Sequence, residues 1–324
     1  MTLPASMKAL RAAEEGERYA CAVEEVPKPV PKTGEVLVRV RASGVNRADL
    51  SQIAGRYPPP AGESAILGME ISGTVVETGE RVCALLAGGG DAEYAAVPAG
   101  QIFSAPPSVE LAAAAGIPEA WITAYLNLVL EGGLARGGAA LVHAAASGVG
   151  LAAIQTAKYL GARAAGTTRS PTKIAALREA GADLAIDTSR QSFAEEVESA
   201  WGKDAVSVIL DPVGADTLAG NLRVLAAKGT VVFLATMSGK AAELDIALLM
   251  KKRARVIGST LRSRSREEKA RLVARFRDEI LPGFDSGALS VRVDSVYPPS
   301  RAAEAFTRMK KNENVGKILI DWGE

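Results

Sequence analysis

Residues 139–161, AALVHAAASGVGLAAIQTAKYLG, decide the fold of this chain. An apolar run is followed by the small residues 144–150 and then by an apolar stretch of helical character. Backbone N–H groups at the start of a helix attract phosphate, and small side chains let the phosphate approach them. Ala145 and Ser147 stand where the usual pattern has its first two glycines, and Gly150 keeps the third. The stretch predicts the strand, loop and helix that open a dinucleotide-binding unit.

The same alternation of strand and helix continues along the chain. Strand-like runs end near His143, Thr168, Asp187, Asp211, Ala235 and Thr260. Helix-like segments separate them at 148–160, 171–180, 192–200, 214–226 and 243–250. Six strands with right-handed crossovers predict a doubly wound parallel sheet of the α/β class, which binds ligands beyond the carboxyl ends of its strands.

The end of the second strand indicates which dinucleotide binds. An NAD-binding unit usually carries an acid about twenty residues after the loop, where it accepts hydrogen bonds from the ribose. No acid occurs between Leu151 and Arg178. Two cations and two hydroxyls follow the strand instead, at Thr168, Arg169, Ser170 and Lys173. They favour a 2′-phosphate and hence NADPH, although the two cations could also do no more than solvate a helix start.

The first 120 residues have a different pattern. Short alternating runs at 35–44, 71–79 and 92–100, punctuated by Gly and Pro, predict a small twisted antiparallel barrel. The tail predicts an amphipathic helix at 266–280 and a last strand within 314–322 that returns to the barrel. We therefore expect a substrate domain made of 1–121 and 263–324, a cofactor domain made of 122–262, and an active site in the cleft between them.

Composition is typical of an enzyme in a reducing cytoplasm. The 324 residues are 48% apolar, the net charge is +1, and no stretch reads as a membrane span or a signal peptide. Cys21 and Cys83 form no disulfide framework. The charge argues against a nucleic-acid-binding protein. One stretch differs, because residues 251–277 hold eleven Lys or Arg and two Glu.

Six motifs in order along the chain resemble those of a known family. They are GVNRADLSQIAGRYPPP (44–60), LGMEISGTVVETG (67–79), IPEAWITAY (117–125), VHAAASGVG (142–150), STLRSR (259–264) and NVGKILI (314–320). They resemble the zinc-free quinone oxidoreductases of the medium-chain dehydrogenase/reductase superfamily. The similarity is greatest to the tumour-suppressor-inducible NADPH:quinone oxidoreductase branch and weaker to zeta-crystallin.

This resemblance implies a GroES-like barrel with a Rossmann cofactor domain inserted in it, NADPH as the reductant, and a homodimer joined through the strand near Arg255–Thr260. Loop, second strand and resemblance together predict the cofactor contacts, which are Asn46, Ala145, Ser147, Gly148, Val149, Gly150, Thr168, Arg169, Ser170, Lys173, Thr188, Val213, Leu261 and Asn314.

The resemblance also bears on zinc. Zinc-dependent relatives place Cys at the position of Asn46 and His at that of Met69, whereas Glu70 keeps the acid that follows the histidine. One histidine and two cysteines cannot supply both a catalytic and a structural zinc site. We therefore expect no metal and regard Glu70 as a structural hydrogen-bond acceptor. Without a Lewis acid, quinones and conjugated enones are better substrates than alcohols.

Transfer of a hydride, or of electrons, to a quinone puts negative charge on an oxygen, which a donor or water must meet. The resemblance suggests Tyr57 and Ser147 for this role, and Asn46 could donate its amide to the cofactor or substrate. Plainer roles remain open: a turn residue packed on prolines for Tyr57, a helix N-cap for Ser147 and loop capping for Asn46. His143 lies at a strand end beside the loop, where general acid catalysis is the less favoured role.

Two departures from the family pattern stand out. The loop after Gly79 lacks residues that relatives usually carry, and Thr188 stands where a tyrosine often packs beside the adenosine phosphate.

Two alternative functions also remain. One is a zinc-free reductase of enones or enoyl thioesters, and the other is a non-catalytic protein that binds NADPH and RNA, as zeta-crystallin-like relatives do. Only the basic stretch 251–277 supports RNA binding, and a solvated helix face also explains it.

Overall fold

The computed structural model describes residues 3–12 and 21–323. The chain forms two compact units, unit 1 from Met1–Ile122 with Leu261–Glu324 and unit 2 from Thr123–Thr260. The sequence predicts a division at 121/122 and 262/263, and these domain bounds stay a prediction. In the described part of the chain, no helix combines the length and apolar character needed to cross a bilayer.

Unit 2 contains the predicted six-stranded parallel sheet, in the spatial order β10-β9-β8-β11-β12-β13. Its strands are β8 (Ala139–Val142), β9 (Arg163–Thr168), β10 (Leu184–Asp187), β11 (Val206–Asp211), β12 (Leu225–Phe233) and β13 (Arg255–Gly258). The order reverses between β8 and β11, so the chain winds outward in both directions from the strand that carries the small-residue loop. β13 lies at the edge of the sheet.

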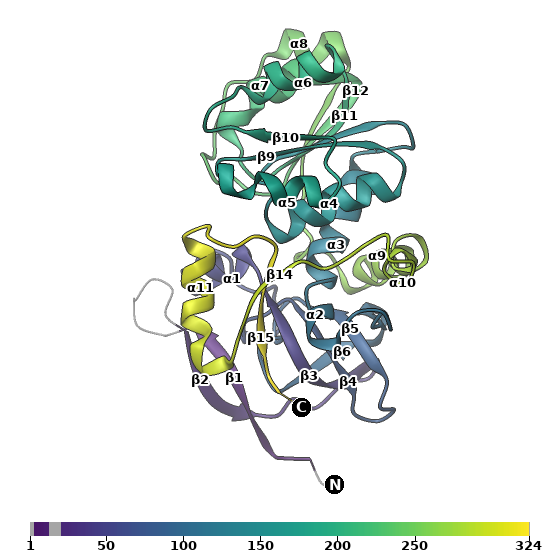
Figure 1. Cartoon of the computed structure of the whole chain (residues 1–324). Coiled ribbons are helices and arrows are strands. Elements are labelled where there is room, and N and C mark those ends of the chain that lie inside the picture. The colour runs from purple at the N-terminus through teal and green to yellow at the C-terminus, as the bar shows by residue number, and fades with distance from the viewer. Residues whose placement is uncertain (1–2, 13–20, 324) are drawn as a thin grey trace. The chain divides into compact units, whose positions relative to one another are not determined.

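Helices cover both faces of this sheet (Figure 1). α4 (Gly148–Tyr159) and α5 (Ile174–Glu179) lie on one side, and α6 (Phe193–Trp201), α7 (Leu218–Val224) and α8 (Ile246–Lys252) lie on the other. Short 3-10 turns at Pro171–Lys173 and Ala215–Thr217 precede α5 and α7. The core is apolar, with Leu141, Val197, Ile209, Leu222 and Val231 almost fully buried. Because both faces are covered, the strands read as continuous apolar runs.

Unit 1 is built on a largely antiparallel sheet in the order β14-β15-β3-β4-β5-β7, with β6 also paired to β3. The strands are β3 (Glu35–Val45), β4 (Glu70–Val75), β5 (Arg81–Leu85), β6 (Tyr94–Pro98), β7 (Ile102–Ser104), β14 (Val293–Tyr297) and β15 (Lys317–Asp321), and β1 (Ser6–Ala12) and β2 (Cys21–Pro27) form a separate pair. β15 pairs antiparallel with β3, beside which it runs in Figure 1. The C-terminal strand therefore returns to this sheet, as predicted.

Short helices connect and cover these strands. They are α1 (Arg47–Ile53), α2 (Leu111–Ala114), α9 (Arg266–Glu279), α10 (Pro282–Asp285), α11 (Ala302–Lys310) and the 3-10 turns Ala99–Gln101 and Pro299–Arg301. α3 (Pro118–Tyr125) runs into a π-helical segment, Leu126–Glu131. α11 packs its apolar side, including Phe306, against Leu50 and Ile318 in the unit 1 core. The amphipathic pattern at 266–280 corresponds to α9.

The segment around Gly79 forms a tight turn between β4 and β5. The N–H of Val75 donates to the carbonyl of Glu80 at 2.9 Å, and the N–H of Gly79 donates to that of Val75 at 2.8 Å. Gly79 has a φ of +75°, which a residue with a side chain rarely adopts. The strands therefore connect directly, without an extra loop.

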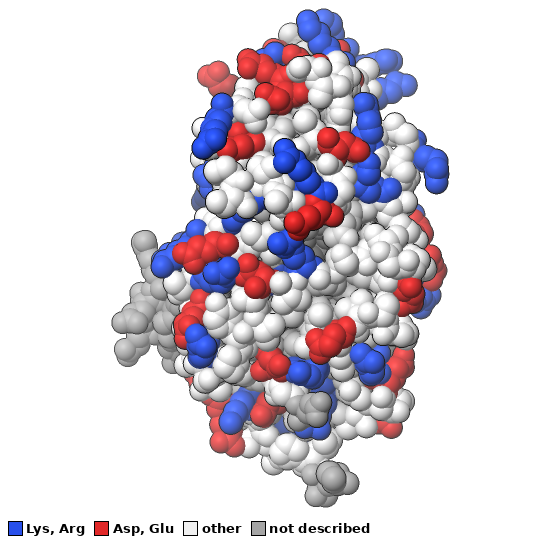
Figure 2. All heavy atoms as spheres, viewed as in Figure 1, with Lys and Arg blue, Asp and Glu red and all other residues white. Residues whose placement is uncertain are grey.

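Charges of both signs mix on the face of the molecule in Figure 2, where Lys and Arg stand among Asp and Glu. This agrees with the net charge of +1.

Candidate functional site

The small-residue loop of unit 2 leaves backbone donors at the start of α4. Ser147 caps the helix, because its Oγ accepts from the N–H of Gly150 at 3.0 Å. The N–H groups of Gly148 and Val149 have no hydrogen-bond partner among residues 3–12 and 21–323. A Cβ at Gly150 would lie 2.5 Å from Cα of Ala145, so the helix packs too closely on the loop for any side chain. The loop thus fits the phosphates of a dinucleotide.

β9 and β10 are the next strands of the sheet beside β8, which the loop follows. Hydroxyls and cations at the ends of these two strands therefore come next to the loop. The N–H of Thr188 donates to the carbonyl of Thr168 at 2.9 Å, so these two predicted residues are neighbours. The N–H of Ser170 donates to Oγ1 of Thr168 at 3.2 Å. Arg169 is exposed, and Lys173 lies in the 3-10 turn that precedes α5. No carboxylate stands where an NAD-binding unit would need one.

His143 belongs to a buried network that connects three strand ends. It is 2% exposed, its Nδ1 lies 2.9 Å from Oγ1 of Thr167, and its Nε2 lies 2.7 Å from Oδ1 of Asn221. Asn221 donates its amide to Asp211 at 2.6 Å, so its oxygen faces the histidine, which carries the proton on Nε2. Burial lowers the pKa of His143. Both ring nitrogens of His143 therefore have partners inside unit 2.

The same network fixes Val213, one of the predicted cofactor contacts. Oδ1 of Asp211 accepts from the N–H of Val213 at 2.6 Å and from that of Gly214 at 3.1 Å. Sequence reasoning missed the part played by Asp211 and Asn221. An aspartate at the end of the fourth strand was the available signal, because a carboxylate there can cap the turn that follows.

In unit 1, Asn46 is held by a buried ion pair. Its amide donates to the carbonyl of Gly44 at 3.0 Å and to Oε1 of Glu70 at 2.8 Å, and its Oδ1 accepts from Nζ of Lys317 at 2.9 Å. Lys317 also donates to Oε1 of Glu70 at 2.5 Å and to the carbonyl of Val45 at 3.0 Å. Both amide hydrogens of Asn46 are thus engaged inside unit 1, and its side chain also takes part in the capping box at the start of α1.

Glu70 is a structural hydrogen-bond acceptor, as predicted. Its Oε2 accepts from the N–H of Glu119 at 2.8 Å, in addition to the two bonds to Oε1. Acids gather around it. Burial, followed by the charge of Glu70, raises the pKa of Glu119 to about 8, and burial raises that of Asp49 to about 6. Within residues 3–12 and 21–323, no group of three His, Cys, Asp or Glu is placed to hold a metal ion. Independence of zinc stays a prediction.

Tyr57 lies in the loop between α1 and β4 and is partly exposed. Its carbonyl accepts from Nη1 of Arg262 at 3.1 Å, and Cζ of Arg262 lies 5.2 Å from the ring centroid. In the described part of the chain its hydroxyl makes no hydrogen bond, so it is available as a donor. Leu261 is buried next to this arginine, and the amide of Asn314 donates to the carbonyl of Gly316 at 2.9 Å, in the turn before β15.

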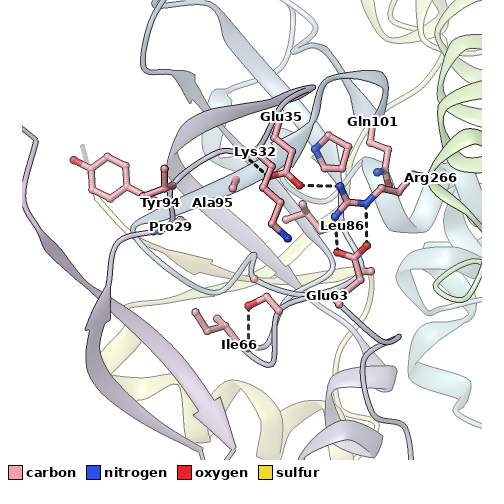
Figure 3. Close-up of a pocket in the computed structure, with 18 of the residues that line it drawn as sticks. Pro29, Lys32, Glu35, Glu63, Ile66, Leu86, Tyr94, Ala95, Gln101 and Arg266 are labelled. Carbon is pink, nitrogen blue, oxygen red and sulfur yellow. Dashed lines mark hydrogen bonds and ion pairs between the residues drawn. The ribbon is translucent and has the colours of Figure 1, made fainter.

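Unit 1 also contains a pocket of about 310 Å³ (Figure 3). Arg266 lies in it between two carboxylates, at 2.8 Å from Glu35 and 3.1 Å from Glu63. Apolar residues such as Ile66 and Leu86 complete its lining. None of the predicted site residues lines this pocket. Because its arginine and glutamates already pair with each other, it adds no candidate catalytic group.

Comparisons with known proteins agree with this arrangement. Residues 32–107 match the family model described as an alcohol dehydrogenase GroES-like domain, and residues 148–277 match that of a zinc-binding dehydrogenase. The predicted fold class, a GroES-like domain with a Rossmann-like cofactor domain, is therefore confirmed.

Individual relatives cover most of the chain. The synaptic vesicle membrane protein VAT-1 homolog of Rattus norvegicus is 31% identical over 318 residues, which are 90% of this chain and 78% of that protein. The quinone oxidoreductase-like protein 2 of Bos taurus is 30% identical over 309 residues, which are 92% of this chain and 88% of that protein. A mycobacterial protein solved in complex with NADPH is 29% identical, with a TM-score of 0.85 over 98% of this chain and all of that one. The chain belongs to the medium-chain dehydrogenase/reductase superfamily, in the branch that holds quinone oxidoreductases and VAT-1 homologs.

Proposed function

We propose that this oxidoreductase transfers a hydride from NADPH to quinones without a metal ion. The observation that carries the proposal is the end of β9, where the cations of Arg169 and Lys173 alternate with the hydroxyls of Thr168 and Ser170 and no acid is present. Such groups recognise a 2′-phosphate by charge-assisted hydrogen bonds, each contributing about 1.5–3 kcal/mol. A relative solved with NADPH supports this choice of cofactor.

Each residue has a distinct part in this proposal. The N–H groups of Gly148 and Val149 bind the pyrophosphate at the start of α4. The Ser147 hydroxyl, which accepts from Gly150, keeps its own hydrogen for a cofactor or substrate oxygen. Asn46 is held by Glu70, Lys317 and the capping box of α1, and any contact it makes to the cofactor would be through Oδ1.

Tyr57 is the proposed donor to the quinone oxygen. NADPH supplies the hydride, and the phenol meets the oxygen that gains negative charge. Tyr57→Phe should lower turnover more than it weakens NADPH binding, because the ring stays and only the hydroxyl is lost. Steady-state rates together with NADPH titrations of both proteins would measure the two effects. Unchanged turnover would remove Tyr57 from the mechanism.

A steady-state assay tests the function as a whole. NADPH and NADH are each paired with ortho-quinones, para-quinones, conjugated enones and an enoyl thioester. We expect quinone reduction with a preference for NADPH. A preference for NADH contradicts the cofactor assignment. Rapid reduction of the enoyl thioester with inert quinones would establish the alternative reductase in place of the quinone reductase. Activity that survives dialysis against a strong zinc chelator is expected, and its loss would contradict independence of zinc.

RNA binding is less well supported, because the basic stretch 251–277 serves the fold. Lys252, Arg262 and Lys269 are buried. Arg266, Arg275 and Arg277 pair with Glu35, Glu279 and Asp278, respectively. Oppositely charged groups also mix on the face in Figure 2. Salt-dependent retention on RNA would reverse this judgement.

Two finer assignments belong to the proposal. The resemblance of the six motifs supports assigning the chain to the tumour-suppressor-inducible NADPH:quinone oxidoreductase branch. A homodimer through β13 is supported by the position of this strand at the sheet edge and by exposed apolar residues in the segment before it, which are Met237, Leu244, Ile246 and Met250. Sedimentation of the purified chain should give the mass of a dimer, and a monomer at all concentrations would exclude it.

A further inference from the structure

Arg262 donates hydrogen bonds that connect the loop carrying Tyr57 to neighbouring segments of unit 1. Arg262 is 3% exposed, and its guanidinium donates to the carbonyl of Ala87 at 2.6 Å, to the carbonyl of Tyr57 at 3.1 Å and to Oε1 of Gln52 at 2.6 Å. Gln52 in turn donates its amide to the carbonyl of Ala65 at 3.0 Å, across the base of the loop. One buried cation therefore holds the Tyr57 loop to α1 and to the segment after β5.

The acceptors of this guanidinium are all neutral. No ion pair joins Arg262 to a carboxylate within residues 3–12 and 21–323, although a buried cation is usually paired with one. The ionisable groups near it include Asp49, Tyr57 and Glu119, and also Lys269, which donates to the Arg262 carbonyl at 2.7 Å. The positive charge of Arg262 is therefore not neutralised by a carboxylate in direct contact. It interacts electrostatically with Tyr57, which it touches.

Arg262 meets Tyr57 in two ways. It binds the backbone carbonyl, and its Cζ lies 5.2 Å from the ring centroid, within the range of a cation–π contact. The first contact fixes the backbone and the second restricts the ring. The hydroxyl itself has no hydrogen-bond partner among the described residues, so these two contacts are the polar ones that hold Tyr57.

We propose that Arg262 is a positioning residue for Tyr57, which fixes the phenol and strengthens its hydroxyl as a hydrogen-bond donor. The proposal rests on the function proposed above, in which this hydroxyl meets the substrate oxygen. A nearby cation stabilises the negative charge that a phenol takes on when it donates strongly. Glu119 opposes it, because an ionised carboxylate nearby has the reverse effect.

Electrostatics of the site support this assignment. Burial and the Glu119 carboxylate raise the pKa of Tyr57, while the Arg262 guanidinium lowers it. A neutral residue of similar size in place of Arg262 should therefore raise the pKa of Tyr57. The same change at Glu119 should lower it.

The direct test is an NMR titration of the full chain labelled with ¹³C at tyrosine. Tyr57→Phe identifies the signal among the six tyrosines. In Arg262→Gln the Tyr57 pKa should rise by about one unit, a tenfold change in proton affinity, and in Glu119→Gln it should fall. Arg271→Gln, which changes an exposed arginine on α9, is the matched control and should leave it unchanged. An unaltered Tyr57 pKa in Arg262→Gln overturns the proposal.

Kinetics provide the second readout. Arg262→Gln should lower kcat with quinone about tenfold or more while the KM for NADPH stays the same, and Arg262→Lys should recover part of the loss because it keeps the charge. Equal losses in the Gln and Lys variants overturn the electrostatic role. If Arg262→Gln does not fold, as judged by circular dichroism, Arg262→Lys carries the test, and unchanged turnover in it excludes positioning.

The titration needs no turnover, so it separates this inference from the proposed function. A shifted Tyr57 pKa together with full activity in Tyr57→Phe leaves the coupling between the two residues intact and removes the tyrosine from the reaction.

Discussion

Nζ of Lys317 lies 2.5 Å from Oε1 of Glu70, and both side chains are almost fully buried. The lysine begins β15 and the glutamate begins β4, so the ion pair joins strands from the two separate sequence segments that make up unit 1. The amide of Asn46 is bonded to both partners. A charge pair in this position holds a predicted site residue in a single orientation.

Removing the cation should therefore destabilise the protein strongly. Lys317→Met leaves the Glu70 carboxylate buried without its counter-charge, and we expect a loss of about 3–5 kcal/mol in the free energy of unfolding. Lys317→Met combined with Glu70→Gln should recover much of it, because no uncompensated charge remains. Urea denaturation of the three proteins measures both effects. A double variant as unstable as the single one would show that the pair does not act as a unit.

Gly150→Ala should weaken NADPH binding without unfolding unit 2. A Cβ there would lie 2.5 Å from Cα of Ala145, so α4 must move away from the loop whose N–H groups face the phosphates. We expect about a tenfold or greater rise in the dissociation constant, because at least one hydrogen bond to phosphate is lost. NADPH fluorescence measures it. Gly258→Ala is the control, since its Cβ would meet no atom within 4 Å, and equal effects of both changes would refute the packing argument.

Lys173→Glu should raise the KM for NADPH and spare NADH. The carboxylate repels a 2′-phosphate and has no such effect on a ribose hydroxyl, so we expect about a tenfold or greater change in the ratio of the two constants. Steady-state kinetics with both nucleotides measure the ratio. Equal changes for NADPH and NADH would mean that no phosphate contact exists at this residue.

Stability should fall as the pH rises toward 8. Burial, with the charges of Asp49 and Glu70, raises the pKa of Asp91 from 3.8 to about 8. A carboxyl whose pKa is raised in the folded state favours folding while it is protonated, and this contribution is lost as the pH rises from about 4 through 8. The melting temperature should therefore be higher at pH 5.5 than at pH 8.5.

Asp91→Asn serves as the control for this dependence. It cannot ionise, so its melting temperature should change less over the same range. The remaining slope comes from Glu119 and Asp49, whose pKa values are raised to about 8 and about 6 in the same direction. Identical slopes for the wild type and Asp91→Asn would exclude Asp91 as the source.

The sequence by itself determined the doubly wound sheet, the capped small-residue loop and the cations after β9. These features depend on periodicity and on residues close together in the chain, which a single sequence displays directly. It also gave the return of the last strand to the barrel, because an apolar run at the C-terminus needs a sheet to bury it.

Only the tertiary structure decided how the predicted side chains are held. Lys317 and Glu70 are 247 residues apart, and Arg262 is 205 residues from Tyr57, so neither pairing leaves a local pattern. Asn46, expected as a donor, gives one amide hydrogen to the nearby carbonyl of Gly44 and the other to Glu70, which only the fold brings to it. Buried polar groups must find partners wherever the chain places them, and that placement is a property of the packed fold.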